Sequence, residues 1–232
     1  MIRELDNTAK SVLCDEIKDA IGPQRYSFLY RTTKRLFDIV CSLFGLLFLL
    51  PITIVVKIAY MVTGDFHSIF YTQDRIGLNG KIFKLYKFRS MVPNADEILK
   101  DILKYDKKRA REYRLNKKMT DDPRITKAGK WIRKHSVDEL PQLINIFIGD
   151  MSLIGNRPYL PREKKDMGKY YDDIVKTKPG LTGFWQCSLR SRGTFEDRLK
   201  MEQYYSNNFG IRFDMSIFFK TFSVVIGGHG AK

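Results

Sequence analysis

Two adjacent carboxylates, Asp138 and Glu139, are the residues of this 232-residue chain best placed to do chemistry. Ser136 followed three residues later by Glu139 is a capping-box signature, and the apolar residues between 140 and 147 recur at helical spacing. The pattern predicts an α-helix with Ser136 as its N-cap and both carboxylates in its first turn, beside free backbone N–H groups. That environment keeps a carboxylate ionised and also attracts phosphate. The stretch alone leaves two interpretations open, a catalytic pair or a helix start with acidic decoration.

Basic residues elsewhere in the chain fit a phosphate ligand. Lys87 and Arg89 lie two apart in a β-prone segment, so they would point to the same face of a strand. Arg157 and Pro158 follow Gly155 in a short loop, where a guanidinium can bind phosphate oxygens bidentately. Each signal is weak alone, because solvated lysines are the default on strands. The formal net charge of +15 indicates an anionic partner: nucleic acid, an anionic membrane or a phosphorylated substrate.

A long apolar segment must position these residues relative to a membrane. Residues 39–56 are 18 consecutive uncharged positions with no polar face, which is the threshold length for a membrane helix. Pro51 removes a backbone hydrogen bond inside this segment and predicts a kink or a break. Because basic residues lie on both sides, both ends should face the cytoplasm. We therefore predict that residues 34–62 form a proline-broken, re-entrant membrane helix.

The remaining elements follow from turn signals and periodicity. Residues 66–89 indicate a β-hairpin around an Asn-Gly turn, residues 94–118 a charged helix, and residues 213–226 an interfacial helix. Residues 1–33 would form an arm or peripheral helix, and residues 63–232 a cytoplasmic catalytic domain. The expected fold is α+β and mainly helical, a monotopic membrane protein with amphipathic helices at the interface. Three scattered cysteines suit neither a disulfide framework nor a zinc site.

The motifs, taken in order, resemble those of the monotopic phosphoglycosyl transferases, bacterial enzymes that start glycan assembly on a polyprenyl-phosphate carrier. The matching segments are residues 34–38, 83–91, 138–143, 149–152, 157–158 and 179–183, which read KRLFD, FKLYKFRSM, DELPQL, GDMS, RP and PGLTG. The resemblance covers roughly residues 31–232.

This resemblance implies a reaction. Asp138 would attack the β-phosphate of a UDP-sugar and release UMP, and undecaprenyl phosphate would then take the hexose-1-phosphate from the aspartyl intermediate. A covalent intermediate splits one hard displacement into two. Glu139, about 100° away around a helix, would serve in positioning, metal organisation or proton handling. The implied cofactor is Mg²⁺, with Asp138 as its protein contact, to neutralise diphosphate charge and assist the departure of UMP.

The resemblance also implies contacts to the substrate. Arg133, Lys87 and Arg157 match basic positions of the family, and Arg190 stands where the family usually has Gly-Arg. The membrane break reads Leu-Pro where the family often has Ser-Pro, so Pro51 alone must form the kink.

The implied partners are a UDP-sugar, polyprenyl phosphate and the anionic cytoplasmic face of the bacterial inner membrane, and the family allows a homodimer. The region 185–205 is more similar to hexose-1-phosphate transferases of capsule, exopolysaccharide and O-antigen pathways, which favours glucose or galactose over an N-acetylated sugar. A nucleic-acid-binding protein would explain the charge, but the chain has no helix-turn-helix, zinc or RNA-binding motif. A non-catalytic membrane scaffold would explain the apolar segment, but not the Asp-Glu pair among basic motifs.

Overall fold

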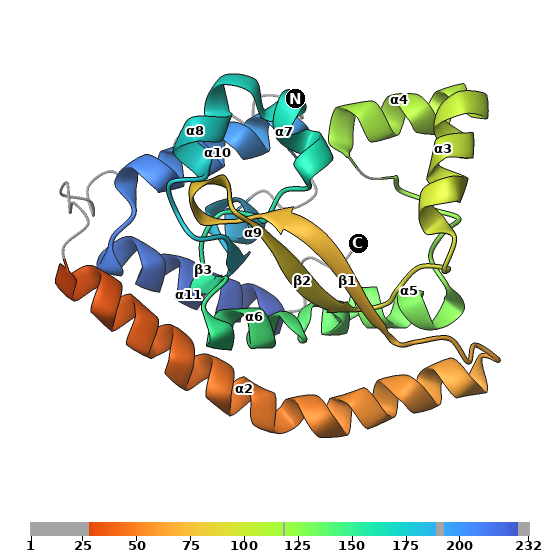
Figure 1. Ribbon diagram of the computed structural model, residues 1–232, viewed down its shortest axis with the longest axis horizontal. Helices are drawn as coiled ribbons and strands as arrows, with labels where there is room; N and C mark the ends of the chain where they lie inside the picture. Colours follow the sequence, from red (N-terminus) through yellow and green to blue (C-terminus); the bar gives the residue numbers. More distant parts are fainter. Residues whose placement is uncertain (1–27, 118, 189–192, 227–232) are drawn as a thin grey trace.

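The computed structural model describes residues 28–117, 119–188 and 193–226 (Figure 1). Most of the predicted arm, residues 1–27, and the predicted contact Arg190 lie outside these residues. The fold is mainly helical, as predicted, and it has a second small sheet besides the predicted hairpin. Its longer elements are α2 (Phe28–Val62), β1 (Phe70–Ile76), β2 (Ile82–Phe88), α3 (Ala95–Tyr105), α4 (Lys107–Asn116), α5 (Lys127–Lys134), α6 (Gln142–Ile148), α10 (Phe195–Asn208) and α11 (Ile211–Ile226). Shorter ones are η1 (Leu78–Gly80), η2 (Val137–Glu139), β3 (Ser152–Ile154), η3 (Pro161–Glu163), α7 (Lys164–Met167), η4 (Gly168–Tyr170), α8 (Tyr171–Ile174), β4 (Gly180–Thr182) and α9 (Phe184–Ser188).

The predicted β-hairpin is confirmed. Strands β1 and β2 pair antiparallel, with Phe70 opposite Phe88 at one end and Ile76 opposite Ile82 at the other. The turn between them needs a left-handed backbone, with φ of 54° at Asn79 and 77° at Gly80. Asparagine and glycine adopt that conformation at the lowest cost, so the turn signal fixes the register.

The charged stretch 94–118 forms two helices where one was predicted. Asp106 lies between α3 and α4 in an extended conformation, and its carboxylate accepts a hydrogen bond of 2.9 Å from the backbone N–H of Arg109. An aspartate with a free side chain is a strong N-cap, so it starts a new helix here. The apolar C-terminal stretch is helical as predicted, and α11 extends it to begin at Ile211.

Helix α2 corrects the prediction of a broken membrane helix. It runs without interruption for 35 residues, begins before residue 34, and contains Pro51. Figure 1 shows it bending near its middle, with the concave side toward the rest of the protein. Proline lacks a backbone N–H and crowds the preceding turn, so it bends this helix without ending it.

Both halves of α2 pack against the same body of the protein. In the first half the Lys34 ammonium lies 2.6 Å from the carboxylate of Asp214 in α11. In the second half Val56 and Tyr60 are fully buried, and the Tyr60 hydroxyl donates to the carbonyl oxygen of Arg89. Only 11% of the most apolar 18-residue window of α2 is buried, so it is not a core helix of the usual kind. The outward side is exposed and apolar: Leu36, Val40, Leu43, Phe44, Leu47, Phe48, Leu50, Ile54, Val55, Ile58 and Met61.

Asp38 fastens α2 to the second sheet, and its replacement should destabilise the fold. Its buried carboxylate accepts hydrogen bonds from the Ser152 hydroxyl at 3.0 Å and the Leu153 backbone N–H at 2.9 Å. Asp38→Ala leaves both donors buried without an acceptor, which should lower the free energy of unfolding by about 3 kcal/mol. Urea unfolding in detergent measures this, with Asp38→Asn, which keeps one acceptor oxygen, expected to lose less. An unchanged midpoint in the alanine variant would refute this role.

Candidate active site

The carboxylate pair is built differently from the predicted capping box. Ser136 has φ 55° and ψ 22°, and its side chain makes no capping hydrogen bond. A capping residue requires an extended backbone, so Ser136 cannot cap. Asp138 and Glu139 belong to the 3₁₀ turn η2, which precedes α6, and not to the first turn of that helix. The Glu139 carboxylate instead reaches strand β2, where it accepts a hydrogen bond of 3.2 Å from Lys87.

Glu139 faces a cleft to which many separate segments contribute. We call it the Asp-Glu cleft; its lining comprises Arg75, Leu85, Lys87, Glu139, Gln142, Arg157, Pro158, Gly180, Leu181 and Gln186. Four of the predicted site residues, Lys87, Glu139, Arg157 and Pro158, are thus brought together from positions 71 residues apart in the chain. Asp138 is half-buried immediately beside Glu139.

Two glycines allow the far wall of this cleft to form. The backbone N–H of Gly155 donates to the Thr182 carbonyl, and that of Gly180 donates to the Asn156 carbonyl, at 2.9 and 2.7 Å. A Cβ on Gly155 would overlap the carbonyl oxygen of Lys178, so the two chains could not approach. This close contact extends the parallel β3–β4 pair and carries the 157–158 loop to the cleft.

The two carboxylates have different electrostatic surroundings. Burial, with the Glu139 charge adding to it, raises the pKa of Asp138 above its ordinary value, against the opposing charges of Lys87 and Arg133. Burial acts the same way on Glu139, but the charges of Lys87 and Arg157 outweigh it and hold the pKa of that carboxyl below its usual range. The ionising environment predicted for the pair therefore applies to Glu139, whereas Asp138 is harder to ionise.

Arg75 is a buried cation of the cleft that sequence reasoning missed. Its guanidinium donates to the Pro158 carbonyl at 2.9 Å and to the Gln73 side chain at 2.6 Å. Burial and the nearby charge of Arg157 lower the pKa of Arg75 to about 10. Burial and Arg157 also lower the pKa of Arg198. The positive charges of these arginines repel one another. A ligand with several negative charges would relieve this repulsion and is therefore favoured at the cleft.

Glu202 in α10 binds the backbone of the loop that carries Arg157. It is 1% exposed, and it accepts a hydrogen bond of 3.2 Å from the backbone N–H of Arg157. Burial raises the pKa of Glu202 to about 7. Nothing in the sequence around Glu202 indicated this contact, whose two residues are 45 positions apart in the chain.

Glu202→Gln should remove a pH dependence of stability. An unfolded glutamate has a pKa of about 4.3, so the protonated folded form contributes stability that is complete below about pH 4.3 and is lost as pH rises to about 7. The loss is on the order of 3 kcal/mol. Urea unfolding at pH 5 and pH 8 should therefore show a smaller difference in the variant than in the wild type. Identical differences would contradict the raised pKa.

Other predicted site residues lie outside the cleft. The Arg89 guanidinium donates to both carboxylate oxygens of Asp65 at 2.8 and 3.0 Å and to the Ser68 carbonyl at 2.6 Å, so its donors hold the start of the hairpin. Arg133 is exposed at the end of α5, where its charge acts on both carboxylates. Pro51 lies in α2.

The carboxylate pair fits a metal ion only in combination with a ligand. Among the described residues no group of three or more His, Cys, Asp or Glu side chains could hold an ion by itself. Mg²⁺ is commonly bound by one or two carboxylates together with substrate phosphates. Asp138 and Glu139 fit that pattern if the phosphates come from a bound substrate.

Comparison with known proteins identifies the family. The family described as "Bacterial sugar transferase" matches residues 29–228. The undecaprenyl-phosphate galactose phosphotransferase of Salmonella typhimurium is 43% identical over 204 residues, which are 87% of this chain and 42% of that protein. The UDP-galactose-lipid carrier transferase of Erwinia amylovora is 40% identical over 201 residues, again 87% of this chain and 42% of the relative.

A shorter relative is matched over most of its length. The exopolysaccharide production protein ExoY of Sinorhizobium fredii is 37% identical over 199 residues, 86% of this chain and 88% of that protein. The chain thus spans less than half of the two galactose-named relatives but is comparable in extent to ExoY. As its motifs predicted, the chain belongs to the bacterial sugar transferase family.

Proposed function

We propose that the chain transfers a hexose-1-phosphate from a UDP-sugar to polyprenyl phosphate and releases UMP, through an aspartyl-phospho-sugar intermediate. The observation that carries this proposal is Glu139 at a cleft, with Asp138 half-buried beside it. Among the described residues, the other charged groups that line this cleft are the cations Lys87, Arg157 and Arg75. Carboxylates that must meet a diphosphate need such cations to overcome the repulsion between like charges.

In the first step, a carboxylate oxygen of Asp138 attacks the β-phosphorus of the UDP-sugar. The bond from that phosphorus to the bridging oxygen breaks, and UMP leaves with the electron pair. The ionised form of Asp138 is the nucleophile, and burial makes that form less stable and more reactive. Lys87 and Arg157 lie where they can bind phosphoryl oxygens as charge moves toward the leaving group.

In the second step, an oxygen of polyprenyl phosphate attacks the same phosphorus. The acyl-phosphate bond breaks, the Asp138 carboxylate is restored, and the product is a polyprenyl diphospho-sugar. The Glu139 carboxylate accepts a hydrogen bond of 3.2 Å from the Lys87 ammonium and so positions it. The charge of Lys87 in turn keeps Glu139 ionised. In the first step, bound Mg²⁺ would neutralise diphosphate charge and assist the departure of UMP, with Asp138 as its protein contact.

Galactose is the sugar we favour. Two relatives at 40% identity or more carry galactose in their names, and both align over 87% of this chain. The sequence alone favoured glucose or galactose equally, so the relatives sharpen the choice. Exopolysaccharide or capsule assembly is the corresponding pathway class.

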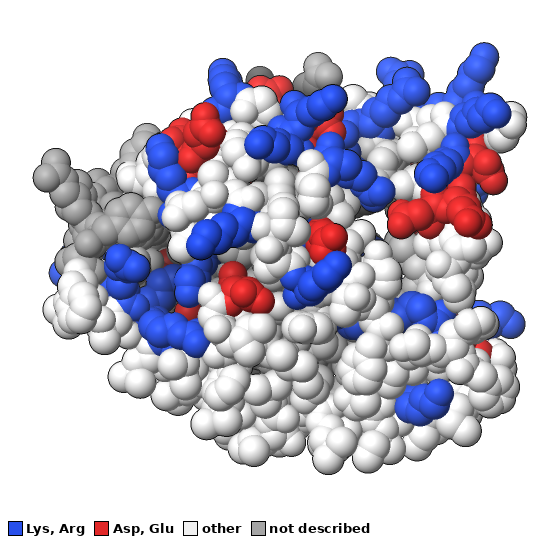
Figure 2. Space-filling model, in the orientation of Figure 1, with Lys and Arg blue, Asp and Glu red and all other residues white. Residues whose placement is uncertain are grey.

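We further propose that α2 lies in one leaflet of the inner membrane, with both ends at the cytoplasmic face. Its outward side is apolar along the whole helix, while both halves pack on the same body of the protein. Because both halves of α2 are bound to the same body of the protein, the helix cannot cross the bilayer unless that body also enters the membrane. Figure 2 supports this orientation, because the surface along α2 is almost free of charge, whereas Lys and Arg gather above it.

The deciding experiment is UMP release by the purified chain with Mg²⁺, undecaprenyl phosphate and a panel of UDP-sugars. Release should require a UDP-hexose and the lipid carrier for multiple turnovers, and UDP-galactose should give the highest kcat/KM. Release only with an N-acetylated sugar would replace the sugar assignment. No release with any of them would leave a non-catalytic membrane scaffold as the function.

A further inference from the structure

A second cavity lies away from the Asp-Glu cleft, between the first half of α2, the hairpin turn and the segment before β4. Its volume is about 920 Å³, within the range of cavities that hold small ligands. Among the described residues it shares no lining side chain with the cleft. Its apolar lining includes Phe28, Leu36, Ile39, Leu78 and Phe209. The proposed reaction gives this cavity no role.

The charged side chains of the cavity are nearly all cations. Among the described residues they are Arg31, Lys34, Arg35, Lys176 and Lys178, against the single acid Asp38. Lys34 and Lys176 each lie within 2.7 Å of an aspartate carboxylate, so their charges are balanced. Asp38 is occupied by its hydrogen bonds to the second sheet. The remaining three cations therefore set the charge of the cavity.

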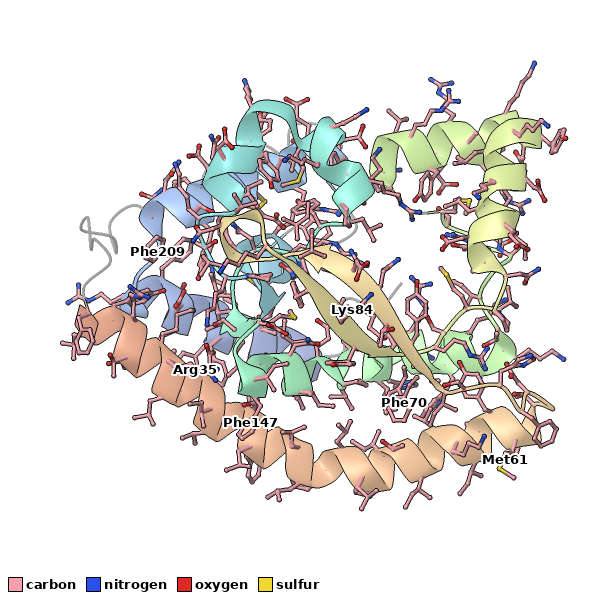
Figure 3. All side chains as sticks on the ribbon, viewed as in Figure 1. Arg35, Met61, Phe70, Lys84, Phe147 and Phe209 are labelled. Atoms are coloured by element: carbon pink, nitrogen blue, oxygen red, sulfur yellow. The ribbon has the colours of Figure 1, made fainter. Side chains whose placement is uncertain are left out.

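In the described part of the chain, none of these three cations forms an ion pair. Arg35 donates to the carbonyl oxygens of Ile146 and Phe147 at 2.6 and 2.7 Å, and neutral carbonyls leave its charge in place. Figure 3 shows Arg35 beside Phe147, where α2 passes the end of α6. Burial and the charge of Arg35 lower the pKa of Lys178, which means that the cavity disfavours its own ammonium. An anion bound there would relieve this repulsion.

We propose that this cavity binds the headgroup of an anionic membrane phospholipid, with the phosphodiester among Arg31, Arg35 and Lys178. The acyl chains would then continue along the exposed apolar side of α2, which begins at Leu36 on the rim of the same cavity. Charge complementarity selects an anion, and the continuous apolar surface selects one that carries chains. Such a lipid would fix how deeply α2 lies in the membrane leaflet. The inference rests on the proposed membrane association and is independent of the sugar transfer.

Short-chain lipids test the site on the full chain in detergent, by calorimetric titration below their micelle concentration. Dihexanoyl phosphatidylglycerol should bind at least tenfold more tightly than dihexanoyl phosphatidylcholine, which has the same chains without net charge. The double variant Arg31→Gln/Lys178→Gln should bind both equally. The matched variant Lys57→Gln/Lys130→Gln, with the same charge change outside the cavity, should keep the preference.

Several outcomes would overturn the inference. Equal binding of both lipids by the wild type, or a preference kept by the cavity variant, removes the headgroup site. Displacement of the phosphatidylglycerol by millimolar inorganic phosphate would assign the cavity to a free anion, and displacement by a peptide of residues 1–27 would assign it to that segment. UMP release in detergent should be the same in both double variants. A protein that binds the lipid selectively but releases no UMP refutes the proposed function alone.

Discussion

Asp138→Asn is expected to lower the rate of UMP release by roughly 10⁴-fold or more, the scale seen when a catalytic nucleophile is removed. The amide is nearly the same size as the carboxylate but cannot attack phosphorus, so no covalent intermediate can form. The variant should remain folded, because Asp138 is only half-buried in a short turn. UMP release and circular dichroism, measured on the same preparation, check both expectations. Retained turnover would remove Asp138 from the nucleophile role.

Two controls make this result specific. Asp150→Asn neutralises another half-buried aspartate close in sequence, outside the Asp-Glu cleft, and should leave turnover unchanged. In the wild type without lipid acceptor, mass spectrometry should find one hexose phosphate on the peptide that contains Asp138.

Since burial raises the pKa of Asp138 and only its ionised form attacks, kcat/KM should fall on the acid side at a pH above the ordinary aspartate value of about 4. An acid limb at or below that value would contradict the raised pKa.

Local patterns predicted the elements whose causes are local. The Asn-Gly turn requires positive φ whatever the surroundings, so the hairpin and its register follow from the sequence. The apolar run predicted where α2 ends, but neither its start at Phe28 nor its continuation through Pro51. Both halves of α2 are held by packing on the same body, and this tertiary contact keeps the helix formed where proline alone favours a break.

The construction of the site was predicted only in part, and the chemistry assigned to it stays a prediction. Lys87, Arg157 and Glu139 lie at one cleft as expected, because the resemblance carried information on their assembly that no single motif holds. The capping box was wrong because the pattern cannot report the left-handed conformation of Ser136. Arg75 could not be found, since its role depends on a contact with the Pro158 carbonyl, 83 residues away.

Lys87→Met is expected to lower kcat/KM by about 10²–10³-fold, the usual cost of one preorganised charge at a reacting group. The Lys87 side chain is 19% exposed and donates to Glu139 at 3.2 Å, so methionine can fill its space but supplies no charge. Lys87 is also the largest of the charges that lower the pKa of Glu139. Lys87 also lowers the pKa of Asp138. Without Lys87 the pKa values of both carboxyls must rise, so activity should be lost at a higher pH as the solution is acidified.

Strand β2 offers a matched control in Lys84→Met. Lys84, labelled in Figure 3, pairs with Asp74 at 2.7 Å, and their side chains are 66% and 50% exposed. An exposed ion pair contributes about 0–1 kcal/mol to stability and nothing at the cleft, so kcat/KM should change less than about twofold. The pH–rate profile should shift upward on the acid side only in the Lys87 variant. Equal losses in both variants would show that activity responds to any loss of charge on β2. A large loss without a pH shift would show that Lys87 does not help to ionise the two carboxyls, and would confine Lys87 to substrate binding.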